Sequence, residues 1–259
     1  MKRSVLVPMD VVLIAISVLA GSALLAQDAV RAPDGGTTFH VGGVELLAIP
    51  GAPFSGKSNV EWTRTLQDGS TITSHLQANL ARDSQGRMYR ERRSFVPASQ
   101  DPSPRVNEIH LYDPVTRSQT ICDPFKKECV VTNYFPQTRF VTRPPGSFAN
   151  GTRYLTREEL GTATIADFKV TGSLETVTVN QGVVGNDRPL VSTREFWYNP
   201  ELQTNLKVIR NEPATGKQVV LLTDVSQSEP DPELFKPPAG YVVKDNRVQQ
   251  QFARPAASQ

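Results

Sequence analysis

The chain has 259 residues, in which 28 lysines and arginines nearly balance 26 aspartates and glutamates, so its formal net charge at pH 7 is only +2. A charge this small provides no bulk attraction to nucleic acid or to a strongly acidic surface, and we expect no nucleic-acid partner. The length is sufficient for one large domain or two small ones.

The N-terminus has the pattern of an export signal. Lys2 and Arg3 precede an apolar run from Val11 to Ala26, which is shorter than the roughly 20 residues that span a bilayer. We therefore predict a signal peptide over residues 1–26 and a periplasmic or secreted protein with no membrane span after cleavage. A retained N-terminal anchor and a buried core segment are the two alternatives.

Composition divides the remainder of the chain into three parts. Residues 27–57 are rich in glycine and proline and are predicted to form an extended arm, with one weak strand at 44–49. Residues 58–243 are predicted to form an antiparallel β domain with a possible internal linker at 136–151. Residues 244–259 are polar and are predicted to be a frayed C-terminal tail.

The predicted β domain is recognised by its period of two. Apolar and polar residues alternate from Ile72 to Leu80, which is typical of a half-buried strand. Asp68 and Gly69 precede this run and indicate a hairpin, because the tight turn needs positive φ at both central positions. Similar patterns predict about eleven antiparallel strands. Only Thr156 to Leu160 resembles a helix start.

The clearest pattern lies in residues 195–243, which are predicted to form three consecutive antiparallel strands and a proline-rich hook. Residues 217–225 carry apolar side chains on both faces, so we expect either the chain or a ligand to cover both. In the hook, Leu234 and Phe235 are predicted to plug the end of the sheet. Residues 240–243 are then predicted to return as a short strand.

Cys122 and Cys129 are the only cysteines. In an exported protein this pair predicts a disulfide that joins two strands of a hairpin, since the compartment is oxidising. Free thiols are one alternative. A redox-active pair is the other, although such pairs are typically separated by two residues at a helix N-terminus.

Other groups able to carry chemistry are scattered. The histidines His40, His75 and His110 do not have metal-ligand spacing, and the paired acids at Glu158–Glu159 and in the hook are typical of solvated surface. We therefore predict that the protein is not an enzyme, and we expect no catalytic residue, no metal and no cofactor.

Two further groups leave alternatives open. Five arginines lie close together in the sequence, and they indicate either a solvated sheet face or a site for an acidic headgroup or polymer. They are Arg82, Arg87, Arg90, Arg92 and Arg93. Trp62 and Trp197 are candidates for core packing or for the lining of a ligand cavity.

Two stretches resemble known protein groups. Residues 83–92, together with residues 185–200, resemble a group of uncharacterised exported bacterial proteins over most of residues 50–243. Residues 235–241, Phe-Lys-Pro-Pro-Ala-Gly-Tyr, are similar to the end of the LolA/RseB-like lipoprotein-carrier superfamily. This second resemblance implies a mainly β fold, a strongly curved antiparallel sheet that forms a half-barrel, whose concave face can hold acyl chains. The helices that cap this face in those carriers have no counterpart in the sequence.

The leading hypothesis from the sequence is a non-enzymatic exported protein that binds a lipid or lipidated ligand on the concave face of a LolA-like half-barrel. The alternative is a cell-envelope protein-interaction or sensor module, for which an exposed apolar patch at a sheet edge would be favourable. A hydrolase would need a polar cleft that gathers acids or a histidine, and the sequence contains no pattern that predicts one.

Overall fold

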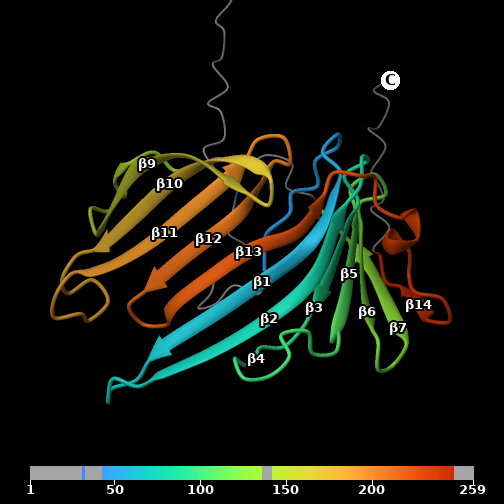
Figure 1. Ribbon diagram of the computed structural model, residues 1–259, viewed down its shortest axis with the longest axis horizontal. Coiled ribbons are helices and arrows are strands. Elements are labelled where there is room, and N and C mark those ends of the chain that lie inside the picture. Colours follow the sequence, from blue (N-terminus) through green and yellow to red (C-terminus); the bar gives the residue numbers. More distant parts are fainter. Residues whose placement is uncertain (1–30, 33–42, 136–141, 248–259) are drawn as a thin grey trace, which may run out of the picture.

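The structure is a computed structural model that describes residues 31–32, 43–135 and 142–247 (Figure 1). The predicted signal peptide, most of the predicted arm including His40, residues 136–141 of the predicted linker and residues 248–259 of the predicted tail lie outside the described residues. In the described ranges, no helix is long and apolar enough to cross a membrane.

The described residues form one open, curved sheet of fourteen strands, which confirms the predicted mainly β fold (Figure 1). The strands are β1 (Phe54–Thr65), β2 (Thr71–Arg82), β3 (Met88–Arg92), β4 (Val96–Pro97), β5 (Glu108–Asp113), β6 (Ser118–Asp123), β7 (Glu128–Asn133), β8 (Gly146–Ser147), β9 (Arg153–Ile165), β10 (Phe168–Val179), β11 (Leu190–Asn199), β12 (Thr204–Glu212), β13 (Gly216–Ser226) and β14 (Val242–Asp245). Their order is β14-β7-β6-β5-β3-β2-β1-β13-β12-β11-β10-β9-β8, with β4 paired to β2.

Most strands pair with their neighbours in sequence through hairpins, as predicted. The hairpin at Asp68–Gly69 joins β1 to β2 as predicted. Gly69 has a φ of 83°, but Asp68 does not have a positive φ, so the expectation of positive φ at both central positions is wrong for Asp68. The predicted helix start at Thr156 is wrong, because this residue lies inside β9 and pairs with Thr176 of β10. Pairing along a whole strand outweighs a short local capping pattern.

One face of the sheet, called here the inner face, carries a continuous apolar core. Val60 of β1 is paired in register with Leu76 of β2 and with Val220 of β13. Val220 in turn pairs with Val208 of β12, and Val208 with Phe196 of β11. All five side chains are buried and belong to one hydrophobic cluster. The register therefore places these five core side chains on the same face of the sheet.

Residues 43–53 pack on this inner face. Val44, Leu46 and Ala48 are buried in the same cluster as Leu80 of β2. The weak strand predicted at 44–49 is wrong, since no strand forms there. Part of its backbone instead hydrogen-bonds to arginine side chains of the sheet. Residues 43–53 thus pack on the inner face of the sheet, the face on which the apolar residue Val220 of the predicted two-sided strand lies.

The predicted hook packs on the opposite, outer face. It contains a 3-10 helix, η1 (Pro232–Phe235), whose N-terminus is capped by the side chain of Asp231. β14 then runs parallel to β7 at the edge of the sheet, whereas every other pairing is antiparallel. The short returning strand was predicted, but its partner and direction were not.

Candidate functional site

Arg82 anchors the N-terminal segment to the inner face. Its side chain is fully buried and donates from Nη1 to the carbonyl of Leu47 at 3.0 Å and from Nε to the carbonyl of Ala52 at 2.9 Å. A third bond from Nη2 reaches the carbonyl of Leu202, between β11 and β12. Burial lowers the pKa of Arg82 to about 10, so the guanidinium stays charged at neutral pH. One side chain therefore joins β2 both to residues 43–53 and to the connection between β11 and β12.

Three more arginines of the predicted cluster hold irregular segments onto the sheet. The contacts are Arg90 with the carbonyl of Val44, Arg93 with the carbonyl of Pro104, and Arg87 with the ring of Phe235 at 5.1 Å. The interpretation as a solvated face is therefore wrong for these arginines and for Arg82. Arg92 is the member of the cluster that is exposed. Sequence spacing could not show this, because the partners of these arginines lie outside the strands of the cluster.

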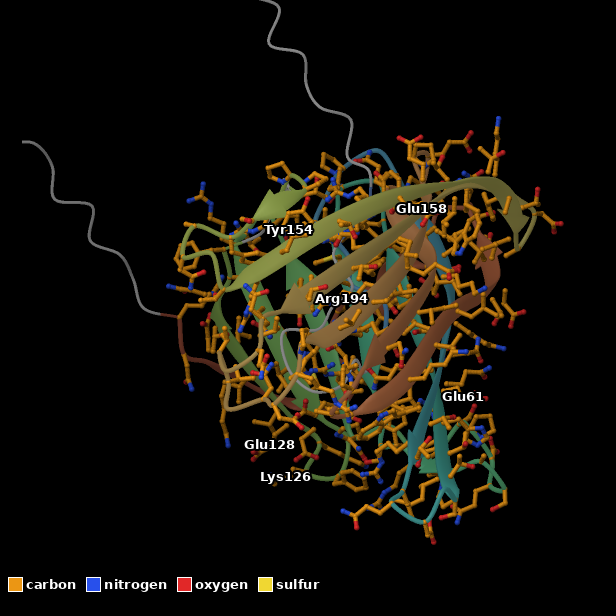
Figure 2. All side chains as sticks on the ribbon, turned by 90° about the vertical axis from the view of Figure 1, so that its left-hand side faces the viewer. Glu61, Lys126, Glu128, Tyr154, Glu158 and Arg194 are labelled. Atoms are coloured by element: carbon orange, nitrogen blue, oxygen red, sulfur yellow. A yellow bond between two sulfur atoms is a disulfide. The ribbon has the colours of Figure 1, made fainter. Side chains whose placement is uncertain are left out.

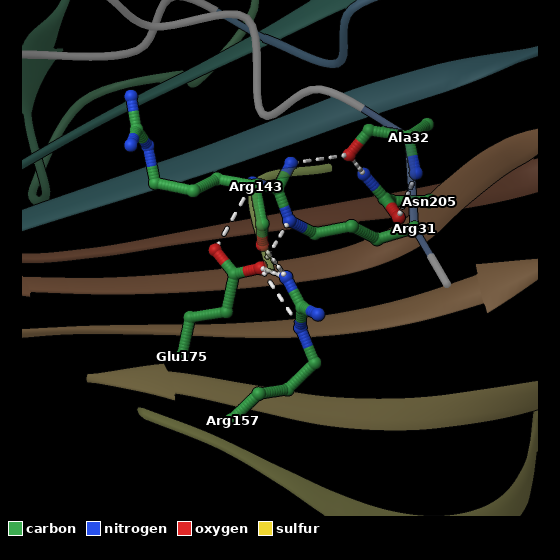
Figure 3. A network of polar contacts seen from close by, with 6 residues as sticks. All are labelled: Arg31, Ala32, Arg143, Arg157, Glu175 and Asn205. Carbon is green, nitrogen blue, oxygen red and sulfur yellow. Dashed lines mark hydrogen bonds and ion pairs between the residues drawn. The ribbon is translucent and has the colours of Figure 1, made fainter. Parts of the chain in front are cut away.

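A second anchor surrounds Glu175 of β10 (Figure 3). Its carboxylate accepts two hydrogen bonds of 3.0 Å from Arg31 and bonds of 2.7 and 3.2 Å from Arg157 of β9. Beside it, the backbone of Ala32 exchanges two hydrogen bonds with the side chain of Asn205. Burial raises the pKa of Glu175, but the two arginines outweigh it and hold that pKa below its usual range.

The predicted cavity residues Trp62 and Trp197 are not brought together. Trp62 lies two residues after Val60, on the inner face, where its Nε1 donates to the carbonyl of Thr215 at 2.7 Å. Trp197 directly follows Phe196 in β11 and therefore lies on the outer face. A role in ligand binding stays a prediction for each tryptophan.

The predicted disulfide is present. Cys122 of β6 and Cys129 of β7 are directly opposite each other, fully buried and joined by a disulfide bond.

His110 of β5 is hydrogen-bonded to Glu108 at 2.7 Å and to Tyr112 at 3.1 Å. Burial lowers the pKa of His110. Across the described ranges, no group of three or more histidine, cysteine or acidic side chains is placed to hold a metal.

The inner face contains a small cavity between residues 43–53 and the sheet. It has a volume of about 80 Å³ and is lined by Glu45, Leu46, Met88, Arg90, Tyr112 and Tyr134. Ligand pockets for drug-sized molecules have volumes of about 300 to 1,000 Å³. This cavity is therefore far too small for an acyl chain, and lipid binding on the inner face stays a prediction.

Exposed apolar side chains gather at one end of the sheet. Tyr154 of β9 and Val191 of β11 flank Thr178 in register, and both are 48% exposed. Val183 and Val184, in the loop between β10 and β11, are 36% and 60% exposed. Figure 2 shows Tyr154 on β9, the strand that pairs there with the short edge strand β8. These four residues are called the end patch below.

The chain matches no family model and no curated protein. Among solved structures, it is similar to an uncharacterized conserved protein from Thermus thermophilus, with 9% identity, a TM-score of 0.41, and coverage of 75% of this chain and 91% of that one. It is also similar to the MucA/MucB complex of Pseudomonas aeruginosa, with 11% identity, a TM-score of 0.34, and coverage of 72% and 56%.

A third similar structure is a LolA superfamily protein from Nitrosomonas europaea, with 12% identity, a TM-score of 0.28, and coverage of 73% of this chain and 91% of that one. The solved structures that match thus include members of the superfamily that the C-terminal pattern resembles. All three TM-scores lie below 0.5, so the function proposed below rests on the chain's own residues.

Proposed function

We propose that this chain is an exported, non-enzymatic protein of the bacterial envelope that recognises a protein partner through the end patch. The observation that carries the proposal is the contrast between the two surfaces on which apolar side chains gather. Those of the inner face are buried in one cluster that includes Val44, Leu46 and Ala48, whereas those of the end patch remain 36–60% exposed.

Exposed apolar side chains that lie together mark interaction surfaces more often than single exposed ones do. Tyr154 adds an aromatic ring with a polar hydroxyl, a combination enriched at protein interfaces. The patch also adjoins β9, whose residues after Leu155 have no second strand partner among the described residues. An apolar segment of another envelope protein is therefore the occupant that this surface fits.

A lipid or lipidated ligand on the inner face is the alternative function. Binding beneath residues 43–53 requires that this segment leave the sheet, because the cavity there measures only about 80 Å³. The hydrogen bonds of Arg82 oppose this movement, since the buried guanidinium would lose two of its acceptors, the carbonyls of Leu47 and Ala52. A buried polar group left unsatisfied costs about 1–3 kcal/mol, and more when it is charged. The geometry thus favours the protein partner.

The test uses a photoreactive residue placed at Val184, with the same residue at Val115 as the matched control. Val115 is 72% exposed but lies in the turn between β5 and β6, away from the end patch. We expect Val184 to cross-link one envelope protein that Val115 does not. V184D should then weaken binding of that purified protein at least tenfold, and V115D should not. Identical products at both positions, or none at Val184, would contradict the proposal.

A further inference from the structure

The outer face contains a cavity beneath the hook. Its volume is about 280 Å³, and it is lined by Ser55, Gly56, Lys57, Asn79, Leu80, Ala81, Tyr89, Asp224 and Leu234. Four neighbouring strands form its floor, and η1 contributes Leu234 as a wall. The volume lies near the lower end of the range for small-molecule sites, so it fits a single ring and not a long chain.

A β-bulge aims one polar side chain at this cavity. Ser55 and Lys57 of β1 pair with Ser226 and Thr223 of β13, so Gly56 faces two residues, Asp224 and Val225. Asp224 has a φ of 52°, a left-handed conformation that costs free energy for a residue with a side chain. Bulges and strained residues of this kind are concentrated at binding sites.

The polar groups of the cavity are both donors and acceptors, and their charges cancel. Lys57 Nζ lies 2.8 Å from Asp224 Oδ2, and both side chains are substantially exposed, at 43% and 64%. Such an exposed ion pair contributes little to stability and can exchange its bonds with a ligand at small cost. A ligand with a net charge would gain little from this balanced pair.

Glu91 holds two more side chains of the cavity, those of Tyr89 and Asn79, in place through hydrogen bonds. Its buried carboxylate accepts hydrogen bonds from the hydroxyl of Tyr89 at 3.0 Å and from the amide of Asn79 at 3.1 Å. Arg93 donates to the same carboxylate from Nη2 at 2.8 Å. These bonds fix the positions of Tyr89 and Asn79 before any ligand binds, which lowers the entropic cost of binding.

The hook that closes the cavity is also fixed. The carboxylate of Glu229 accepts hydrogen bonds from the backbone N–H and hydroxyl of Ser84, at 3.1 Å to Oε1. The Arg87 guanidinium lies over the Phe235 ring. Leu234 therefore presents an apolar surface opposite the polar rim of Lys57 and Asp224.

From these features we infer that the outer-face cavity binds one sugar ring of a glycan. A sugar ring is uncharged, its hydroxyls both donate and accept hydrogen bonds, and its C–H faces are apolar. The cavity supplies the complement of each property: Asp224, Lys57 and Asn79 for the hydroxyls, and Ala81, Leu234 and the Tyr89 ring for the C–H faces. This site is separate from the end patch.

The experiment is an NMR titration of the full protein with glucose, galactose and N-acetylglucosamine in turn, with dodecylphosphocholine as an amphiphilic comparison. We expect at least one sugar to shift the Asn79 side-chain amide and the Asp224 backbone amide saturably at millimolar concentration. Shifts from the amphiphile alone, or no saturable shift at these groups with any of the three sugars, would overturn the inference.

A pair of glycine substitutions provides the matched variants. D224G removes the carboxylate and relieves the left-handed backbone, so the fold is retained, and it should weaken sugar binding at least tenfold. Asp167 has a φ of 68° in the turn between β9 and β10, outside the cavity. D167G makes the same backbone change and should leave the affinity unaltered. Equal affinities for D224G and the unsubstituted protein would also overturn the inference.

Discussion

Arg82 Nη1 donates to the carbonyl oxygen of Leu47 at 3.0 Å, and this bond joins the centre of the sheet to a segment that is not part of it. The arginine is fully buried, and its partners among the described residues are three backbone carbonyls, whose dipoles face its charge. The inner face is therefore closed by residues 43–53 through directed polar bonds as well as through apolar packing.

Replacing Arg82 should destabilise the whole fold. R82M leaves three buried carbonyls without a donor, and we expect the free energy of unfolding to fall by about 3 kcal/mol or more, measured by urea denaturation. R92M is the matched control, since Arg92 is exposed, and it should change stability by less than about 0.5 kcal/mol. Equal effects of the two substitutions would show that Arg82 is not an anchor.

The Cys122–Cys129 disulfide should make a moderate contribution to the free energy of unfolding. Loop-closure entropy predicts that it stabilises the protein by roughly 2.5 kcal/mol. We expect a reducing agent to lower the urea midpoint of the unsubstituted protein and to leave that of a C122A/C129A variant unchanged. A midpoint that does not respond to reduction in the unsubstituted protein would contradict this.

Glu175 should make stability depend on pH in the acid range. Its folded-state pKa lies below the ordinary value of 4.5, so its stabilisation is complete above the unfolded-state pKa and is lost as the pH falls through the lower folded-state pKa. E175Q should lower the free energy of unfolding by about 3 kcal/mol at pH 7, because it removes one partner of a buried ion pair. The difference from the unsubstituted protein should shrink as the pH falls from about 5 towards 3.

The matched control for this experiment is E158Q, because Glu158 lies on the neighbouring strand β9 and is exposed. It should have little effect on stability at any pH. An E175Q penalty that is the same at pH 7 and at acid pH would show that the carboxylate charge is not what the two arginines stabilise.

Gly172 should not tolerate a side chain, because Trp197 lies against it. A Cβ atom there would lie 2.8 Å from Trp197 Cζ3 and 2.9 Å from Leu160 Cβ. We expect G172A to lower the free energy of unfolding by about 1–3 kcal/mol and to shift the tryptophan fluorescence of the protein. In a W197L background the penalty should be smaller, which a double-mutant cycle measures. An unchanged penalty would show that Trp197 is not the residue that is displaced.

The elements that local patterns determine were predictable from the sequence. The Asp68–Gly69 hairpin, the three strands after residue 190 and the hook depend on turn chemistry and on a period of two, and the structure contains them. The segment 43–53 was not predictable as a cover of the inner face, because its pattern indicated only a weak strand and the hydrogen bonds from Arg82 and Arg90 depend on the tertiary structure. The outer-face cavity depends on a bulge at Asp224, and sequence patterns do not reveal a register shift.

Native mass spectrometry of the mature protein, purified gently from a bacterial periplasm, tests the central claim that the inner face is filled by the chain itself. We expect a single bare mass, equal to the chain without residues 1–26 and less two hydrogens for the disulfide. A stoichiometric additional mass that organic solvent releases as lipid would contradict it, because residues 43–53 would then have to leave the inner face.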